Sequence, residues 1–295
     1  MSNPNAPWTV RRIYQWTSGF FAERGLSSPK QDALFLIGDA LGIDRNQVLL
    51  RFDQPLEEAE LQGIRSRVKR RSTGEPVAYI TGHKGFWTLD LKVDPRVLIP
   101  RPETERLVEL ALEALKVPPL NAVDAPRIVD VCTGSGCVAL ALASELPTAR
   151  IAALDISPDA LAVAHENVAA LELTERVACL KGDLLAPVPA DKPVELIVSN
   201  PPYIERGDIE QLMLDVRDHE PHLALDGGPD GFDLIRPLVS QAAERLVTGG
   251  RLLFEIGADQ GPGAQAICEA DDRFVAVKVH KDYGQRDRVV EAIRA

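Results

Sequence analysis

The stretch Asp130-Val-Cys-Thr-Gly-Ser-Gly136 leads the chain out of an apolar run, Arg127–Val131, that predicts a strand. After it, apolar residues recur with a helical period as far as Leu146. A turn of small residues at the start of a helix lets a ligand approach the backbone N–H groups closely. These residues therefore predict an α/β fold with a ligand site where this strand ends.

The chain beyond this turn alternates strands with helices. Strands are predicted at 151–155, 177–180, 196–199, 251–256 and 274–279, with a weaker signal at 289–290. Ser157 caps the helix over 157–171 and Pro158 takes its first position. Such alternation is typical of a mostly parallel sheet that helices cover on both faces.

The first part of the chain has another pattern. From Trp8 to about Arg71 apolar residues recur three and four apart, which predicts a small helical bundle, with Ser28 and Pro29 opening its second helix. A basic run ends it, and we interpret that run as a solvated face or as a docking patch for an acidic partner. The run consists of Arg65, Arg67, Lys69, Arg70 and Arg71.

A change of composition follows the bundle. Residues 77–80 and 86–93 predict two strands around a Gly-rich turn, hence a β-hairpin between two domains. The expected organisation is a partner-docking bundle over 1–75, a hairpin linker over 76–95 and a second domain over 96–295.

Composition narrows the function. The 295 residues carry 33 Lys+Arg against 44 Asp+Glu, a net charge of -11, so the surface as a whole repels nucleic-acid phosphate and acidic membranes. No stretch predicts a secretory signal or a membrane span, so we expect a cytoplasmic protein with no membrane partner. The four Cys and five His are scattered, which predicts neither a metal site nor a disulfide framework.

The loop Asn200-Pro-Pro-Tyr203 follows another predicted strand, where open α/β sheets bind ligands. Its two prolines fix their own φ and stiffen the corner. The Asn200 side-chain oxygen and the Pro201 carbonyl can accept both hydrogens of a planar NH2 group, while the Tyr203 ring lies against its π-face. Asn200, Pro201, Pro202 and Tyr203 therefore predict a clamp for an amide or an exocyclic amine, although a Pro-rich turn with a buried Tyr explains the isolated motif equally well.

Three further positions suit an adenosine. Asp155 ends the next strand about 20 residues after the glycine turn, where a carboxylate commonly accepts two ribose hydroxyls. Asp183 and Leu184 follow a third strand, where they could meet the amino group and the face of an adenine. A dinucleotide stays possible because Gly134-Ser-Gly-Cys-Val-Ala139 fits G-x-G-x-x-G/A. S-adenosylmethionine fits better, because a methyl donor needs a nucleoside pocket beside a nucleophile pocket.

A proline-bounded loop precedes these motifs. Arg101 lies between two prolines and is held extended, while Glu103 and Glu105 open a helix. The loop is either a well-capped helix start or a substrate loop in which Arg101 and Glu103 contact the substrate.

With these motifs assembled, the chain closely resembles the bacterial protein-glutamine N5-methyltransferases that modify peptide chain release factors. The resemblance covers essentially the whole length. It rests on IPRPETE (99–105), DVCTGSG (130–136), NPPY (200–203), HEPHLAL (219–225), GGPDG (227–231) and DYGQRDR (282–288). It implies a class I S-adenosylmethionine-dependent methyltransferase, with a Rossmann-like, mostly parallel seven-stranded sheet and a small N-terminal helical domain joined by a β-hairpin. It also implies class 1 release factors as partners. From the acidic balance we expect no direct nucleic acid contact, and we expect a monomer.

By position, the resemblance implies cofactor contacts from residues 132–136, Asp155, Leu184 and Asn200, and a glutamine site at residues 200–203. The full predicted cofactor set is Asp130, Cys132, Thr133, Gly134, Ser135, Gly136, Asp155, Asp183, Leu184 and Asn200. The family usually has Gly in place of Cys132. We therefore expect either that the backbone there needs no positive φ or that the cofactor loop is slightly displaced, with activity retained.

Three alternatives stay open. An adenine-N6 methyltransferase of DNA or RNA uses the same clamp, although the acidic balance and the lack of a basic, aromatic-interleaved groove weigh against it. A nicotinamide-dependent oxidoreductase is allowed by the glycine pattern alone. A non-enzymatic interaction module is the third alternative, but it would not need an intact cofactor loop.

Overall fold

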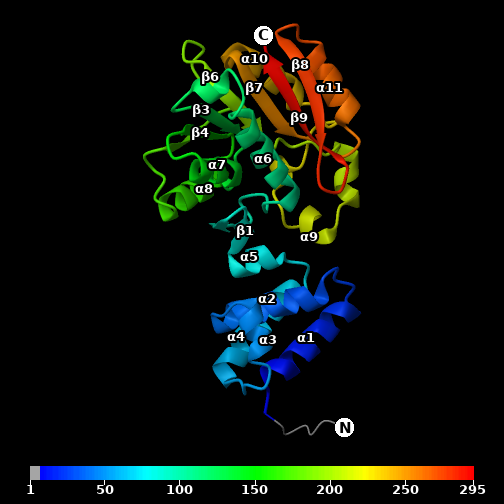
Figure 1. Cartoon of the computed structure of the whole chain (residues 1–295). Coiled ribbons are helices and arrows are strands. Elements are labelled where there is room, and N and C mark those ends of the chain that lie inside the picture. Colours follow the sequence, from blue (N-terminus) through cyan, green and yellow to red (C-terminus); the bar gives the residue numbers. More distant parts are fainter. Residues whose placement is uncertain (1–6) are drawn as a thin grey trace. The chain divides into compact units, whose positions relative to one another are not determined.

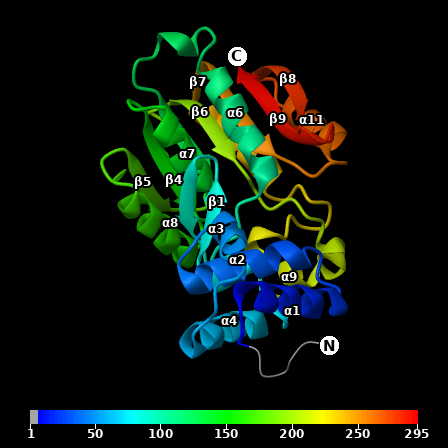
Figure 2. The same ribbon diagram turned by 60° about the horizontal axis from the view of Figure 1, so that its bottom comes forward.

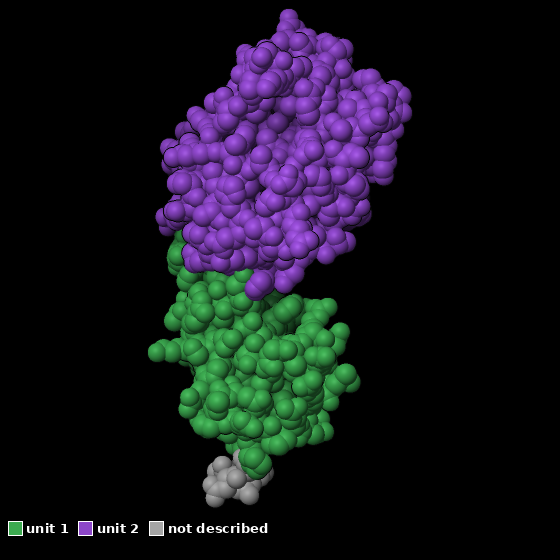
Figure 3. Space-filling model, turned by 90° about the vertical axis from the view of Figure 1, so that its left-hand side faces the viewer, with its two compact units in different colours: residues 1–82, 213–219 green, residues 83–212, 220–295 purple. Residues whose placement is uncertain are grey.

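The computed structural model describes residues 7–295, which form two compact units. The first unit contains the chain up to Gly82 together with Met213–His219 (Figure 3). The second unit contains His83–Leu212 and Glu220–Ala295. The first unit is therefore built from two separate stretches of sequence. The domain boundaries at residues 75 and 95 stay predictions.

The first unit is a bundle of helices (Figure 1). Apolar side chains such as Phe21, Leu36 and Ile64 are fully buried in its core. Polar caps set two helix starts, because the Thr9 hydroxyl accepts the Arg12 N–H and the Asp44 carboxylate accepts the N–H groups of the first turn that follows it. The helices are α1 (Val10–Glu23), α2 (Pro29–Leu41), α3 (Arg45–Leu50), α4 (Glu58–Arg71), α5 (Val77–Thr81) and α9 (Leu214–Arg217).

The predicted start of α2 is only partly confirmed. Pro29 does take the first helical position, and Ser28 precedes it, but the Ser28 side chain makes no capping hydrogen bond. The fixed φ of the proline therefore does more for this helix start than the hydroxyl does.

The basic run at the end of α4 is largely paired inside the first unit. Arg71 is buried, and its Nε donates to Asp32 Oδ2 at 2.8 Å while its Nη2 lies 3.7 Å from Asp215 Oδ2 in α9. Three other arginines of the run have carboxylate partners, in the pairs Arg65–Glu58, Arg67–Asp39 and Arg70–Glu75. These two ion pairs of Arg71 connect α2, α4 and α9, and they help to hold the segment 213–219 in this unit.

Residues 77–80, predicted as a strand, lie in a helix instead. Helix α5 starts after Pro76 and ends at Gly82, whose φ of 79° suits the glycine that commonly follows a helix. The β-branched run suggested a strand, but burial of Tyr79 and Ile80 outweighed that preference. The predicted hairpin is present but starts later, with β1 (His83–Phe86) antiparallel to β2 (Leu89–Lys92).

The second unit is organised around a seven-stranded sheet, in which the strand order is β5-β4-β3-β6-β7-β9-β8. The pairs from β5 to β7 are parallel, whereas β9 is antiparallel to both β7 and β8. All seven predicted strands are present, and the mostly parallel sheet is confirmed. The strands are β3 (Arg127–Val131), β4 (Arg150–Asp155), β5 (Val177–Lys181), β6 (Val194–Ser199), β7 (Leu246–Glu255), β8 (Phe274–Lys281) and β9 (Asp287–Arg294).

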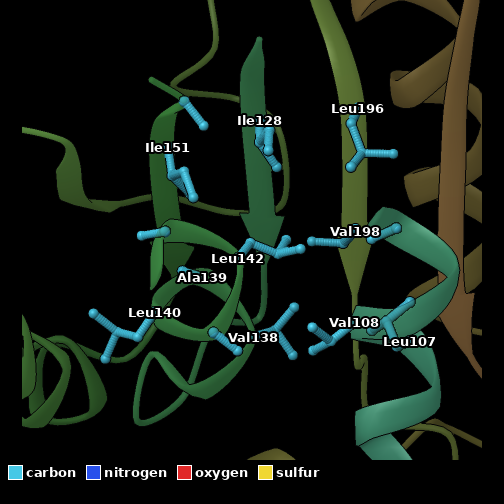
Figure 4. Close-up of a cluster of buried hydrophobic side chains, with 14 of the residues drawn as sticks. Leu107, Val108, Ile128, Val138, Ala139, Leu140, Leu142, Ile151, Leu196 and Val198 are labelled. Carbon is cyan, nitrogen blue, oxygen red and sulfur yellow. The ribbon is translucent and has the colours of Figure 1, made fainter. Parts of the chain in front are cut away.

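Helices cover both faces of this sheet, and alternate strand residues supply the two cores. Ile128, Leu196 and Val198 face the core that contains α6 and α7 (Figure 4), whereas Val129 and Ile197 face the core that contains α10 and α11. Figure 2 shows α7 and α8 beside β4 and β5. The helices are α6 (Glu105–Ala114), α7 (Cys137–Glu145), α8 (Pro158–Ala170), α10 (Ile235–Arg245) and α11 (Gly261–Glu269). Short 3-10 helices are η1 (Pro102–Thr104), η2 (Leu120–Ala122), η3 (Arg206–Gln211) and η4 (His222–Ala224).

The strand order fixes where a ligand can enter. After β3 the chain adds β4 and β5 on one side, and it then returns to place β6 on the other side of β3. The loops after β3 and β6 therefore diverge at the carboxyl edge of the sheet, which is where open α/β sheets bind ligands.

Candidate active site

A single cavity in the second unit brings most of the predicted site residues together. Strands β3 and β6 are paired with Val131 beside Ser199, so Cys132 and Asn200 leave the sheet next to each other. The predicted residues that line the cavity are Arg101, Asp130, Cys132, Thr133, Gly134, Ser135, Asp155, Asp183, Leu184, Asn200 and Pro202. Gly136, Pro201, Tyr203 and Glu103 do not line it. The glycine turn and the NPPY corner thus share one cleft.

The turn after β3 requires left-handed backbone at three positions. Cys132, Gly134 and Gly136 have φ values of 58°, 56° and 84°. The first of our two alternatives, that the backbone at Cys132 needs no positive φ, is therefore wrong, and the cysteine adopts the conformation that the family's glycine would take without strain. A Cβ added to Gly134 would meet no atom within 4 Å, so the backbone there faces open space.

Asp130 holds this turn from beneath. It is 1% exposed, and its Oδ2 accepts hydrogen bonds from the Thr133 hydroxyl at 2.6 Å and from the Ala139 N–H at 3.1 Å. Burial raises the pKa of Asp130 to about 7, against the lowering effect of those two hydrogen bonds. The carboxyl group thereby joins β3, the turn and the first turn of α7.

Asp155 is fixed at the end of β4 by two backbone donors. Its Oδ2 accepts the Gly134 N–H and its Oδ1 accepts the Ser157 N–H, each at 2.9 Å. Burial raises its pKa, and the same backbone hydrogen bonds oppose that rise. Each carboxylate oxygen can accept more than one hydrogen, so the group keeps capacity for a ligand's hydroxyls in a fixed orientation.

The cavity fits a nucleoside cofactor on three observations. Ser135 Oγ is buried beside the Cys137 thiol and has no hydrogen-bond partner of normal geometry among residues 7–295, as expected of a group that a ligand completes. Leu184 has a φ of 48°, so two non-glycine residues with left-handed backbone, Cys132 and Leu184, line this cavity, and such strain commonly collects at ligand sites. Gly134 leaves room beside the backbone. S-adenosylmethionine suits these residues.

The NPPY corner is anchored from behind. Asn200 Nδ2 donates to Thr104 Oγ1 at 3.2 Å, and the Tyr203 hydroxyl donates to Glu255 Oε1 at 3.1 Å. Burial raises the pKa of Tyr203, and the neighbouring Glu255 adds to that rise. The Tyr203 backbone carbonyl accepts from Gln260 Nε2 at 2.8 Å. The corner is therefore held at both its ends.

The glycines of the GGPDG motif have a steric reason. A Cβ on Gly227 would come within 2.8 Å of the Tyr203 backbone. A Cβ on Gly231 would lie 2.5 Å from the Tyr203 carbonyl oxygen, and this residue also has a φ of 76°. The loop can pack against the NPPY corner only because both positions lack a side chain.

The proline-bounded loop is positioned by a buried carboxylate. Glu220 is 3% exposed, and its Oε1 accepts from Arg101 Nη2 at 2.5 Å while its Oε2 accepts the Ile99 N–H at 3.0 Å. Arg101 lines the cavity, whereas Glu103 is exposed and lies outside its lining. The roles of both residues in substrate binding stay predictions.

Sequence reasoning missed three residues of this site. Glu220 and Thr104 were part of quoted motifs but had no role, and Glu255 lay in a predicted strand but was not considered. A buried acidic residue at the end of an apolar strand, as in Phe254-Glu255, was the available signal for Glu255. Thr104 gave none, because its contact with Asn200 joins residues 96 positions apart.

Comparison with known proteins finds a matching family model for each part of the chain. Residues 12–82 match the family model described as the PrmC N-terminal domain, and residues 109–219 match the methyltransferase small domain. A release factor glutamine methyltransferase of Rhodopirellula baltica is 36% identical over 291 residues, which are 99% of this chain and 98% of that protein. The Moorella thermoacetica protein of the same name is 44% identical over 273 residues, 92% and 94% of the two chains. The chain belongs to the release factor glutamine methyltransferase family.

Membership of the release factor glutamine methyltransferases confirms the resemblance noted in the motifs. A solved methyltransferase structure from Pyrococcus furiosus is 16% identical with a TM-score of 0.51, over 78% of this chain and 96% of that chain, and it supports the fold. The match to the PrmC N-terminal domain ends at residue 82, where the first stretch of the first unit ends. Within residues 7–295, no helix is both long enough and apolar enough to cross a bilayer.

Proposed function

We propose that this chain transfers a methyl group from S-adenosylmethionine to the side-chain amide nitrogen, N5, of the glutamine in the Gly-Gly-Gln motif of class 1 peptide chain release factors. One observation carries the proposal. Asn200 and Pro202 of the NPPY corner, whose acceptors suit both hydrogens of an amide NH2, line the same cavity as the nucleoside-type residues Asp155, Asp183 and Leu184. The names of the relatives point to glutamine in a release factor as the amide.

Bound S-adenosylmethionine would supply an electrophilic methyl group. Residues 130–136, Asp155, Asp183 and Leu184 would hold it, because they line the cavity or form its glycine turn. The fixed Asp155 carboxylate suits two ribose hydroxyls, and the open space over Gly134 lets the ligand lie against the backbone.

The protein's task is to make a poor nucleophile react. The lone pair of an amide nitrogen is delocalised into its carbonyl group. Asn200 Oδ1 and the Pro201 carbonyl would accept the two N–H hydrogens, orient the nitrogen, and stabilise the positive charge that develops as it becomes pyramidal. Each acceptor would contribute roughly 2 to 4 kcal/mol to the transition state, by analogy with oxyanion-hole donors. No side-chain base is required, because the product cation can release its proton to water.

The direct test is mass spectrometry of the organism's own release factor after incubation with this protein and S-adenosylmethionine. We expect one added methyl, mapped by fragmentation to the glutamine of the Gly-Gly-Gln motif. An unmodified release factor together with methylated adenine in DNA or RNA would overturn the proposal in favour of the adenine-N6 alternative. Among residues 7–295, no observation favours the nicotinamide alternative over S-adenosylmethionine.

Asn200→Ala tests the clamp itself. It should lower turnover by about a hundredfold or more, because one acceptor is lost from the transition state. The S-adenosylmethionine dissociation constant measured by calorimetry should change far less. Normal turnover of this variant would contradict the clamp.

We further propose that the first unit binds the release factor, because a free glutamine side chain offers little binding energy to orient its amide. Its surface carries aromatic side chains beside arginines, such as Trp16 stacked on Phe20 with Arg24 at 3.7 Å from the Phe20 ring centre. Trp16→Ala with Arg24→Glu should raise KM for the intact release factor. A short Gly-Gly-Gln peptide is the control, and its KM should not change. An unchanged KM for the intact protein would count against docking by this surface.

A further inference from the structure

A buried asparagine of α8 connects the glycine turn after β3 with the hairpin. Asn167 is 3% exposed and does not line the cavity. Its Nδ2 donates to the Ser135 carbonyl at 2.9 Å and to the Lys92 carbonyl at 3.0 Å, and its Oδ1 accepts the Lys92 N–H at 2.8 Å. Both hydrogens of the amide and its oxygen are therefore used on two segments that are distant in the sequence.

The partners of Asn167 fix the orientation of its amide. Both groups that meet Nδ2 are carbonyl oxygens, which only accept, and the group that meets Oδ1 is an N–H, which only donates. The reversed amide would set its oxygen against two carbonyl oxygens and its NH2 against a donor. This position therefore needs an amide, because an ionised Asp offers no donor and a Leu of similar size offers no polar group.

Ser135 is the residue of the glycine turn that Asn167 holds. The peptide unit that follows it is fixed on two sides, because Asn167 binds its carbonyl while the Gly136 N–H donates to the Thr133 carbonyl at 2.8 Å. The same turn contains Cys132 with a φ of 58°, a conformation that a non-glycine residue keeps only where its surroundings determine it. Loss of the Asn167 contact would therefore let the turn relax.

Lys92, the second partner, is the last residue of β2 and stands immediately before a segment of the cavity wall, residues 93–101. Glu166, the neighbour of Asn167 on α8, strengthens this attachment. It pairs with the Lys92 ammonium group, and its Oε1 accepts from Arg96 Nη2 at 3.3 Å. Helix α8 thus holds both the glycine turn and the start of this wall. The members of the segment that line the cavity are Arg96, Val97, Leu98, Pro100 and Arg101.

We infer that Asn167 is a positioning residue for the cofactor, which holds the Ser135 peptide in the conformation that binds S-adenosylmethionine and couples that turn to β2. This inference rests on the proposed function and deepens it, because it concerns the same cavity. Without the Asn167 amide, the turn has its binding conformation in only a fraction of molecules, and the apparent affinity falls by that fraction. Once the cofactor is bound, every molecule has the competent turn, so the methyl transfer itself proceeds normally.

The first test compares cofactor binding with turnover in the full-length protein. Asn167→Leu removes all the hydrogen bonds of the amide at similar size, whereas Asn167→Asp, studied at about pH 8 so that the carboxylate is ionised, keeps only an acceptor for the Lys92 N–H. We expect each variant to raise the S-adenosylmethionine dissociation constant in calorimetry by about tenfold, as for a turn that is competent in about a tenth of molecules. The kcat at saturating cofactor should stay within about twofold of wild type.

Arg176→Met is the matched control. Arg176 Nη1 also donates to two backbone carbonyls, those of Ala143 at 2.8 Å and Leu146 at 3.0 Å, but at the end of α7 away from Ser135. This variant should be less stable than wild type in urea unfolding and should bind S-adenosylmethionine normally. A dissociation constant raised as much as in Asn167→Asp would reveal a general structural defect and would overturn the inference.

The second test measures the coupling and needs no methyl acceptor. Lys92 does not line the cavity, so its N–H responds to the cofactor only through other residues. In wild type, S-adenosylmethionine should slow hydrogen exchange at the Lys92 N–H by up to about tenfold, because coupling between two sites is reciprocal. In Asn167→Asp this N–H keeps an acceptor, yet its exchange should no longer respond to the cofactor.

A wild-type dissociation constant in Asn167→Asp, a loss of kcat at saturating cofactor in place of a loss of affinity, or a Lys92 N–H that still responds to the cofactor in this variant would overturn the inference. Because Asn167→Asp carries both measurements, the test survives if Asn167→Leu fails to fold. A wild-type protein that binds S-adenosylmethionine but leaves the release factor unmodified would instead overturn the proposed function, and the binding and exchange measurements would still decide the role of Asn167.

Discussion

Removal of the Glu220 side chain should damage both the stability of the second unit and the substrate loop. In Glu220→Ala the buried Ile99 N–H loses its acceptor, and Arg101 loses its carboxylate partner. An unsatisfied buried N–H costs about 1 to 3 kcal/mol. The Arg101 side chain is 32% exposed, so its ion pair is screened by water and adds no more than about 1 kcal/mol. We therefore expect a loss of about 1 to 4 kcal/mol in the free energy of unfolding.

Glu220→Gln is the matched variant. Its amide oxygen can still accept the Ile99 N–H, so only the charge opposite Arg101 is lost, and the expected cost is about 1 kcal/mol. Both variants should raise KM for the release factor, because both release Arg101 from its fixed position in the cavity wall. Arg101→Ala should give a similar KM with a smaller loss of stability.

The assay for stability is the urea dependence of hydrogen exchange in peptides from the second unit, because the two units need not unfold together. The same variants are then compared in steady-state methylation of the intact release factor. The reasoning is refuted if Glu220→Ala is as stable as wild type within about 1 kcal/mol, or if Glu220→Gln is as unstable as Glu220→Ala.

The remaining predictions concern the cofactor cavity. The pKa of Asp130 is raised from 3.8 to about 7, so the wild type should lose stability relative to Asp130→Asn as pH rises between those values. The loss should reach up to about 1.4 kcal/mol per pH unit, measured by urea unfolding at about pH 5 and about pH 7. The same stability difference between the two proteins at both pH values would contradict this prediction. Gly182→Ala should destabilise the protein by about 1 to 3 kcal/mol and weaken S-adenosylmethionine binding in calorimetry, because the added Cβ would lie 2.0 Å from Pro187 Cγ. Wild-type binding and stability would show that this loop can shift to accommodate the Cβ at no cost. Asp155→Ala should raise the S-adenosylmethionine dissociation constant, and an unchanged constant would remove Asp155 from the site. Cys132→Gly relieves left-handed strain of about 1 to 2 kcal/mol but adds chain entropy of about 0.5 to 1 kcal/mol to the unfolded state. The free energy of unfolding should therefore rise by about 0 to 1.5 kcal/mol, and cofactor affinity should be retained. A strong loss of affinity would show a specific role for the thiol.

Local patterns in the sequence predicted the parts of the fold that depend on nearby residues. Alternating strands and helices gave the parallel sheet, and Ser157 with Pro158 gave the start of α8, where the serine hydroxyl accepts the Ala160 N–H at 3.2 Å. The strand predicted at residues 77–80 was wrong. Only five residues lie between Pro76 and Gly82, too few to show a helical period, so their β-branched composition decided the prediction.

Contacts between distant residues lay beyond such patterns. Glu220 meets Ile99 across 121 positions, and Tyr203 meets Glu255 across 52, so neither partner is visible in a local window. The φ of Cys132 was also hidden, since a cysteine in a turn is compatible with either sign. Motifs therefore located the cavity, whereas the residues that orient its side chains came only from the folded chain.

The two-part composition of the first unit limits how it can be exchanged. In the sequence, Met213–His219 lies between Tyr203 and Glu220, which both belong to the second unit. The segment nevertheless packs with the N-terminal helices, where Asp215 faces Arg71. A truncation that removes only the chain up to Gly82 would leave α9 without the bundle it packs on. A chimaera that borrows the bundle from a relative must therefore carry over residues 213–219 as well. Recombination at a single junction would separate two stretches that pack in one unit.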